Sequence, residues 1–311
     1  MTMATTCKNS CRRSAEVVDV HQSPGGPPLT GVQALALGSA HSCARMGGGE
    51  IRCWGLNNAG QLGDGTTISW PTPVAILQAP GGPPLTDVQA LALGAWHSCA
   101  RLSDGDVRCW GHNDFGQLGN GMIATEPPLG ALTPVAVLQS PGGPPLTGAL
   151  ALALGSAHSC ALLGGGDVRC WGYNSSGQLG NGTTVTQPTP VAVVQAPGGP
   201  PLTGAQALAL GYGHSCARLS DGDLHCWGHN DFGQLGDGTT TDRLTPVAVL
   251  QAPGGPPLTD VQALALGGEH SCALLGGSDV RCWGRNSLGQ LGDGTTINQL
   301  TPVVVGLPDM P

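Results

Sequence analysis

Short apolar runs separated by glycine and proline follow one another along the whole chain. Between residues 88 and 139 these runs are VQALALG (88–94), HSCARL (97–102), DVRCWG (106–111) and TPVAVLQ (133–139). Runs of this length bounded by Gly and Pro predict β-strands, and none is long enough for a typical helix. The pattern therefore predicts an all-β chain built from groups of four short strands.

This group of four strands occurs five times. Each copy carries the triplet His-Ser-Cys, which begins at His41, His97, His158, His214 and His270. The distance between the second and third triplets is longer because of extra residues in NGMIATEPPLGALTPV (120–135), which indicate an exposed loop. Four antiparallel strands per repeat at this period predict a β-propeller with one four-stranded blade per repeat.

The predicted propeller covers residues 16–311. We expect five complete repeats, over about 31–86, 87–147, 148–203, 204–259 and 260–311. Residues 16–30 match the end of a repeat and predict a partial N-terminal blade, because the last repeat already has its own fourth strand in TPVVVG (301–306). For residues 1–15 we expect a disordered or irregular tail.

A three-residue turn sets the register of the two middle strands. The turn SDG at 103–105 has glycine where a left-handed conformation is needed, which sets Cys99 opposite Cys109. The same count pairs Cys43 with Cys53, Cys160 with Cys170, Cys216 with Cys226, and Cys272 with Cys282. Opposed Cβ atoms lie about 4.5–5.5 Å apart, slightly wider than the ~3.8 Å of a disulfide. A strained disulfide and a reduced, buried pair fit equally well, and the redox compartment decides between them.

A longer motif gives the repeat a family resemblance. The string WGLNNAGQLG from Trp54 recurs as WGHNDFGQLG, WGYNSSGQLG, WGHNDFGQLG and WGRNSLGQLG. With the preceding HSCA and VRC segments, this sequence resembles the regulator of chromosome condensation repeat family in its bacterial form, over roughly residues 31–306. The resemblance implies a propeller, commonly with seven blades, whose faces bind other proteins. It implies no particular partner, because the members of one fold family differ in function.

The composition limits the class of partner. Charged residues make up 10% of the chain, the formal net charge is −8, and Lys8 is the only lysine. Nucleic-acid binding is not expected, because affinity for a phosphate backbone comes from Lys and Arg. No stretch approaches the ~18 apolar residues of a membrane span. The beginning of the chain has no apolar export segment, so as written we expect a cytoplasmic protein, or a secreted or cell-surface one if the N-terminus is truncated.

The recurring polar and aromatic residues have structural explanations. We expect the five triplet histidines to hydrogen-bond the backbone at blade turns, because one histidine per blade keeps the copies too far apart for a metal. The segment Asp64-Gly65-Thr66 predicts a turn, since one carboxylate per copy is a poor calcium site. The recurring PGGPPLT predicts a stiff connector between blades. Core packing is predicted for the repeated tryptophans, Trp54, Trp110, Trp171, Trp227 and Trp283.

The differences between copies predict where a partner binds. Rigid blades hold variable loops on one face, and aromatic and arginine side chains at loop tips are common interface anchors. These residues are Trp96, Phe115, Tyr173, Tyr212, Phe232 and Arg285. The leading hypothesis is a non-catalytic protein–protein interaction scaffold with a protein partner of unknown identity and no cofactor.

The alternative hypothesis is an enzyme. A polysaccharide lyase or hydrolase would use a polar pocket at the propeller axis. Catalysis would require one blade to carry a unique acid, base or nucleophile. The unique residues Glu269 and Asp242-Arg243 form no convincing pair, so no catalytic residue is predicted.

Overall fold

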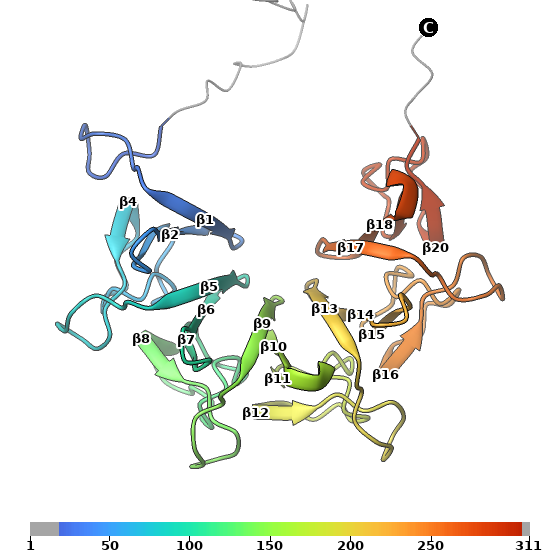
Figure 1. Ribbon diagram of the computed structural model, residues 1–311, viewed down its shortest axis with the longest axis horizontal. Coiled ribbons are helices and arrows are strands. Elements are labelled where there is room, and N and C mark those ends of the chain that lie inside the picture. The colour runs from blue at the N-terminus through green and yellow to red at the C-terminus, as the bar shows by residue number, and fades with distance from the viewer. Residues whose placement is uncertain (1–18, 307–311) are drawn as a thin grey trace, which may run out of the picture.

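Five antiparallel sheets, each of four strands in chain order, form the structure (Figure 1). The computed structural model describes residues 19–306. The all-β propeller with one four-stranded blade per repeat is thereby confirmed, while the exact boundaries of the repeats stay a prediction. Two 3-10 turns, η1 (Gly164–Gly166) and η2 (Gly276–Ser278), lie between strands of the third and fifth blades.

The strands of the first three blades are β1 (Val32–Leu37), β2 (His41–Met46), β3 (Ile51–Gly55), β4 (Trp70–Ala75), β5 (Val88–Leu93), β6 (His97–Leu102), β7 (Val107–His112), β8 (Gly130–Ala136), β9 (Ala149–Leu154), β10 (His158–Leu163), β11 (Val168–Gly172) and β12 (Gln187–Ala192). The last two blades contain β13 (Ala205–Leu210), β14 (His214–Leu219), β15 (Leu224–Gly228), β16 (Arg243–Ala248), β17 (Val261–Leu266), β18 (His270–Leu275), β19 (Val280–Gly284) and β20 (Gln299–Val304).

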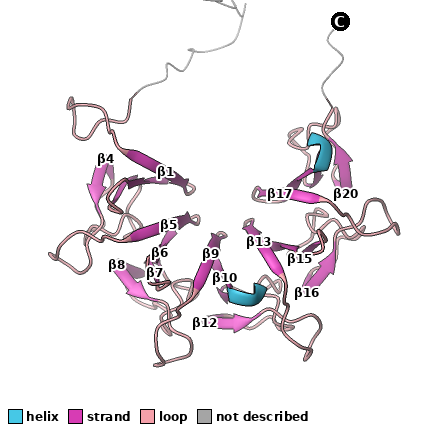
Figure 2. Cartoon of the chain, viewed as in Figure 1, coloured by secondary structure: helices cyan, strands magenta, loops and turns pink. Residues whose placement is uncertain are grey.

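The blades stand around a central axis in an open arc. Figure 2 shows the first strand of each blade nearest the axis and the fourth strand at the rim. The first and last blades face each other across the opening, and both ends of the described part of the chain lie on that side (Figure 1). Among the blades that residues 19–306 form, the first therefore has a neighbour on one side only, and so does the last.

A hydrogen-bonded turn connects each rim strand to the next inner strand. In the first of these connectors, Gly82 N donates to Ala79 O at 2.9 Å, and Gly81 has φ +68°. Proline followed by a glycine with positive φ is the sequence of a type II turn. Gln78 then holds the two sides of the connector together, since its side chain donates to Pro84 O at 3.1 Å.

The same turn precedes the first blade. His21 forms a β-bridge with Pro28, as Leu77 does with Pro84 in the next connector. The expected partial blade over 16–30 begins before residue 19, so its first residues lie outside the described residues. The tail expected over residues 1–15 also lies outside them.

The hydrophobic core lies between neighbouring blades. One cluster joins Cys99, Cys109 and Leu118 of the second blade to Ala161 and Trp171 of the third. The repeated tryptophans of blades two to five are fully buried, which confirms the expected core packing at Trp110, Trp171, Trp227 and Trp283. Trp54 is only half-buried, because no described blade precedes the first one.

Candidate interaction face

The loops that vary between copies gather at one end of the blades. His41 pairs with Gly55 and Leu37 pairs with Ser42, so the turn before each His-Ser-Cys and the loop after each Trp-Gly lie at the same end. We call this end the loop face. It consists of the turns 38–40, 94–96, 155–157, 211–213 and 267–269 and the loops 56–69, 113–129, 173–186, 229–242 and 285–298. The opposite end, the hairpin end, carries the turn between the second and third strands and the connectors.

A buried asparagine holds each loop of the loop face in shape. The side-chain oxygen Oδ1 of Asn57 accepts from Leu62 N at 2.8 Å, and its side-chain nitrogen Nδ2 donates to Asp64 Oδ1 at 3.0 Å and to Thr66 O at 3.1 Å. Its equivalents are Asn113, Asn174, Asn230 and Asn286. Sequence reasoning did not assign this residue a structural role, although its recurrence within loops that otherwise vary was a usable signal.

The Asx-Gly segments are turns, as expected. Asp64 Oδ1 accepts from Thr66 N at 3.0 Å, and Asp64 Oδ2 accepts from Trp70 Nε1 at 2.9 Å. At the equivalent Asp237, burial alone would raise the pKa of the carboxyl. Hydrogen bonds from Thr239 and Arg243, together with the Arg243 charge, hold that pKa below its ordinary value. The carboxylates of Asp64 and Asp237 therefore stabilise the loops that contain them.

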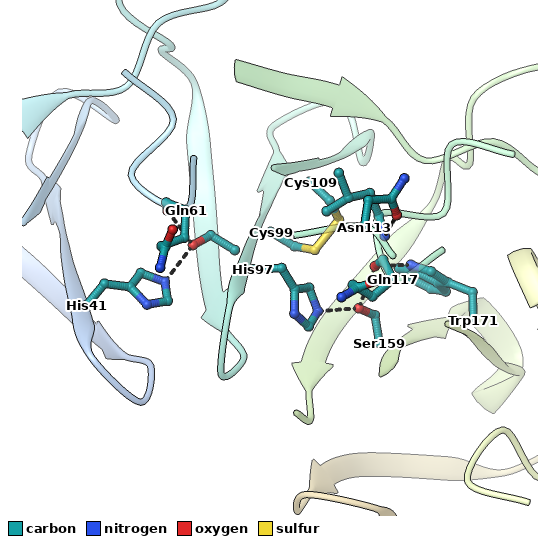
Figure 3. Close-up of a disulfide and its surroundings, with 11 residues drawn as sticks. His41, Gln61, His97, Cys99, Cys109, Asn113, Gln117, Ser159 and Trp171 are labelled. Atoms are coloured by element: carbon teal, nitrogen blue, oxygen red, sulfur yellow. Dashed lines mark hydrogen bonds between the residues drawn. A yellow bond between two sulfur atoms is a disulfide. The ribbon is translucent and has the colours of Figure 1, made fainter. Parts of the chain in front are cut away.

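The triplet histidines of the first four blades hydrogen-bond the next blade, as Figure 3 shows for His41 and His97. His41 Nε2 lies 2.8 Å from Ser98 Oγ of the next blade, and that hydroxyl donates to Gln61 O of the first blade at 3.0 Å. Trp110 Nε1 donates to the same carbonyl at 3.0 Å. The relay recurs as His97–Ser159 (2.8 Å), His158–Ser215 (3.0 Å) and His214–Ser271 (2.9 Å). For these four histidines the expectation of backbone hydrogen bonds was wrong, because the packing of adjacent blades brings a serine hydroxyl of the next blade to each of these rings.

The relay fixes the protonation of these histidines. A serine hydroxyl has one hydrogen, which goes to the glutamine carbonyl, so the histidine must donate through Nε2–H. Burial lowers the pKa of His97, His158 and His214 to about 3, and that of His41 to about 4. The rings are therefore neutral at pH 7, with Nε2 committed to holding two blades together.

The cysteine pairs lie side by side in the expected register. Cys99 is opposite Cys109 on β6 and β7, with their Cα atoms 4.1 Å apart. In the structure this pair is bridged by a disulfide, and so are Cys43–Cys53, Cys160–Cys170, Cys216–Cys226 and Cys272–Cys282. Each bridge joins the two middle strands of one blade.

All six residues predicted to bind a partner lie on the loop face. Trp96 and Tyr212 are 40% and 58% exposed, in turns that precede a triplet histidine. The other four are half-buried and pack in pairs across blade boundaries. The Phe115 and Tyr173 rings are 4.5 Å apart, and the Arg285 guanidinium lies 5.2 Å from the centre of the Phe232 ring. Arg285 also forms an ion pair with Glu269.

One group of polar side chains on the loop face has the composition of a metal site. His229, Asp231 and Asp242 each bring a ligand atom to within 4.8 Å of the others. Gln234 donates to His229 Nδ1 at 2.8 Å, and its own amide oxygen accepts from Phe232 N at 3.0 Å, which sets the orientation of the amide. The ring hydrogen is then on Nε2, which donates to Asp231 at 3.1 Å. This arrangement orients a carboxylate and leaves no free ring nitrogen for a metal.

The loop face also holds two cavities. A cavity of about 250 Å³ at the axis is lined by leucines and glycines of all five blades, together with Ser39, Ala95, Ser156 and Tyr212. Its described lining contains no histidine or carboxylate, which gives no support to the predicted alternative of a catalytic axis pocket. A second cavity, of about 380 Å³, is lined by Asn58, Ala59, Trp96, His112, Pro127, Pro128 and Leu129. Sequence reasoning noticed the extra residues in 120–135, most of which lie in the loop 113–129 of the structure, but not this cavity.

The described residues contain no helix that is both long enough and apolar enough to cross a membrane.

Known proteins share this repeat. A family model described as "Regulator of chromosome condensation (RCC1) repeat" matches residues 49–101, 104–162, 165–218, 221–274 and 279–310. The ultraviolet-B receptor UVR8 of Arabidopsis thaliana is 28% identical over 91% of this chain and 71% of its own length. The E3 ubiquitin-protein ligase HERC2 of Homo sapiens is 28% identical over 87% of this chain, but over only 5% of its own length. These relatives are eukaryotic, so they do not support the expected bacterial form of the repeat.

Solved structures share the fold. Human WBSCR16 aligns with a TM-score of 0.68 at 23% identity, over 89% of this chain and 67% of that protein. Prp20p from Saccharomyces cerevisiae, whose structure is described together with its binding to Gsp1p and histones, aligns with a TM-score of 0.68 at 24% identity, over 90% of this chain and 66% of Prp20p. At these identities the likeness establishes the architecture alone.

Proposed function

The chain belongs to the regulator of chromosome condensation (RCC1) repeat family, and we propose that it is a non-catalytic scaffold whose loop face binds a protein partner. The observation that carries this proposal is that large apolar side chains are exposed on loops of fixed shape. Nine large ones lie there: Ile68, Trp96, Met122, Ile123, Leu129, Val185, Tyr212, Leu288 and Ile297. Exposed apolar surface rimmed by polar residues is typical of protein interaction sites.

The loops are suited to binding because the blades hold them rigidly. Each buried asparagine fixes its loop, and each relay of histidine, serine and glutamine carbonyl fixes one blade against the next. A surface ordered before binding loses less conformational entropy when a partner docks. The disposition of Trp96 and Tyr212 is therefore set in advance by the fold.

The relatives support the class of function and leave the partner open. Prp20p is described as binding Gsp1p and histones, which supports protein binding as a use of this fold. The ligase HERC2 is matched over 5% of its length, so its activity is not transferred to this chain. The axis cavity offers no acid or base in its described lining, so the enzyme hypothesis has no favouring observation.

A capture experiment tests the proposal. The full chain is immobilised, exposed to an extract of its native source, and its bound proteins are quantified by mass spectrometry. We expect a bound protein that is lost when Trp96→Ala and Tyr212→Ala are combined. The matched control is Leu150→Ala, which removes a 60% exposed leucine from β9, away from the loop face. Equal capture by all three proteins would show that the loop face is not the binding surface.

A further inference from the structure

The cavity beside Trp96 is a preformed apolar groove between the first two blades. Trp96, Pro127, Pro128 and Leu129 supply most of its wall, and Asn58 and His112 supply polar groups. The indole of Trp96 is 40% exposed and Leu129 is 37% exposed, so both have apolar surface available for a ligand. Its volume of about 380 Å³ is in the range of a site for one or two side chains.

Much of the groove wall belongs to the loop 113–129, which is longer than the equivalent loops of the other blades. Hydrogen bonds hold this loop in place. The Asn113 amide nitrogen donates to Met122 O at 3.0 Å, and Ala124 N donates to Asn113 O at 2.9 Å. The long loop is thus held by Asn113, the equivalent in the second blade of the buried asparagine that shapes each of the other loops on the loop face. Met122 and Ile123 of this loop are 65% and 44% exposed, so the loop carries further apolar surface outside the groove lining.

Acidic residues strongly outnumber basic residues on the loop face. Its turns and loops contain eight acidic residues and one arginine: Asp64, Asp114, Glu126, Asp231, Asp237, Asp242, Glu269, Asp293 and Arg285. The single arginine is already paired with Glu269. Seven of the other eight described arginines lie on the second and third strands, and Arg243 begins β16, where it pairs with Asp237. A cationic partner would therefore be attracted to the loop face, and an anionic one repelled.

Acidic groups also border the groove itself. Glu126 is exposed and directly precedes Pro127, and Asp114 lies 2.9 Å from the ring of His112 in the groove wall. The groove thus offers an apolar floor with carboxylates at its edge. An apolar side chain flanked by lysine or arginine matches both features.

From the apolar groove and its acidic border we propose that the loop face binds a basic protein segment, which inserts an apolar side chain between Trp96 and Pro127-Pro128 and places flanking cations near Asp114 and Glu126. This inference rests on the proposed protein-binding function and specifies the chemistry of the partner. The specificity comes from charge and from the groove together, since neither feature alone distinguishes this segment from other peptides.

A random dodecapeptide phage library selected on the immobilised full chain provides the probe. We expect selected peptides to carry net positive charge and at least one large apolar residue. The dissociation constant of a selected peptide, measured by fluorescence anisotropy, should rise about three- to tenfold when Asp114→Asn and Glu126→Gln are combined. It should rise about tenfold with Trp96→Ala, and binding should weaken with added salt. The matched control combines Asp104→Asn and Asp221→Asn, which removes two exposed charges from the hairpin end and should leave the affinity unchanged.

Two outcomes would overturn this inference. One is a selected set that is neutral or acidic, and the other is a basic peptide that binds Trp96→Ala as tightly as the unaltered chain. Neither depends on the capture experiment. If a native partner is captured through the loop face while the selected peptides are acidic, the scaffold function stands and the proposed partner chemistry fails.

Discussion

The imidazole Nε2 of His97 lies 2.8 Å from the hydroxyl of Ser159, across the boundary between the second and third blades (Figure 3). Ser159 in turn donates to Gln117 O at 3.0 Å, and Trp171 Nε1 donates to the same carbonyl at 2.9 Å. All four residues are fully buried or nearly so. This relay joins the blades by polar contacts as well as by apolar packing.

Removing the hydroxyl should destabilise the propeller. Ser159→Ala leaves the His97 Nε2–H buried without an acceptor, which costs about 1–3 kcal/mol of unfolding free energy. Urea unfolding measures the loss. Ser42→Ala is the matched control, because no described blade precedes Ser42 to bring it a histidine, and it should cost much less. Equal losses at the two positions would mean that the relay contributes nothing to stability.

The buried histidines should make the protein sensitive to acid. The pKa of His97, His158 and His214 is about 3 in the folded chain, against 6.5 for an unperturbed histidine. The unfolded state therefore binds more protons between pH 6.5 and about 3, so the unfolding free energy falls as the pH falls through this window and levels off above it. Each fully titrating histidine contributes a slope of about 1.4 kcal/mol per pH unit.

Comparing variants isolates this effect from the titration of carboxylates. Unfolding free energies at pH 7.5, 6.0, 5.5 and 5.0 should show a smaller slope for His158→Gln than for the unaltered chain, by about 1.4 kcal/mol per pH unit below pH 6. The half-buried His270 should have a weaker effect when it is replaced in the same way, because burial lowers its pKa less completely. Identical slopes for all three proteins would contradict the burial of neutral histidine.

A glycine at the end of β11 should tolerate no side chain. Gly172 has φ +102°, and a Cβ there would lie 2.6 Å from Ala157 O and 2.9 Å from His158 Cα. Gly172→Ala should cost at least about 1–3 kcal/mol from the backbone conformation alone. Gly164→Ala in the same blade is the control, since a Cβ there meets open space, and we expect a change within about 0.5 kcal/mol. Thermal and urea unfolding of the two variants give the comparison.

The disulfides should differ in their access to reductant. Cys272 in the last blade is half-buried, whereas the cysteines of the first four bridges are completely buried. Brief treatment of the native protein with dithiothreitol, followed by alkylation and mass spectrometry, should label Cys272 and Cys282 first. The other pairs should react only when blades separate. Equal labelling of all five pairs would show that covering by a neighbouring blade does not protect them.

The sequence alone was sufficient to determine the blade. Alternating short runs and breakers defined the four strands, and a three-residue turn placed Cys99 opposite Cys109, as the structure has them. It also located the variable residues, because each loop differs at the same positions of the repeat. These features are local: the two partners of each contact lie within one hairpin or one loop, so the number of residues between them determines which atoms meet.

Only the tertiary structure decided what joins one blade to the next. His97 meets Ser159 at a separation of 62 residues, the Phe115 ring packs at a tilt against Tyr173, and the groove beside Trp96 forms where the long loop 113–129 reaches the first blade. The open arc of blades and the excess of acidic over basic residues on the loop face were likewise decided only by the tertiary structure. Such contacts depend on how each sheet is rotated and displaced against its neighbour, and that geometry arises from the packing of whole faces rather than from the spacing of residues along the chain.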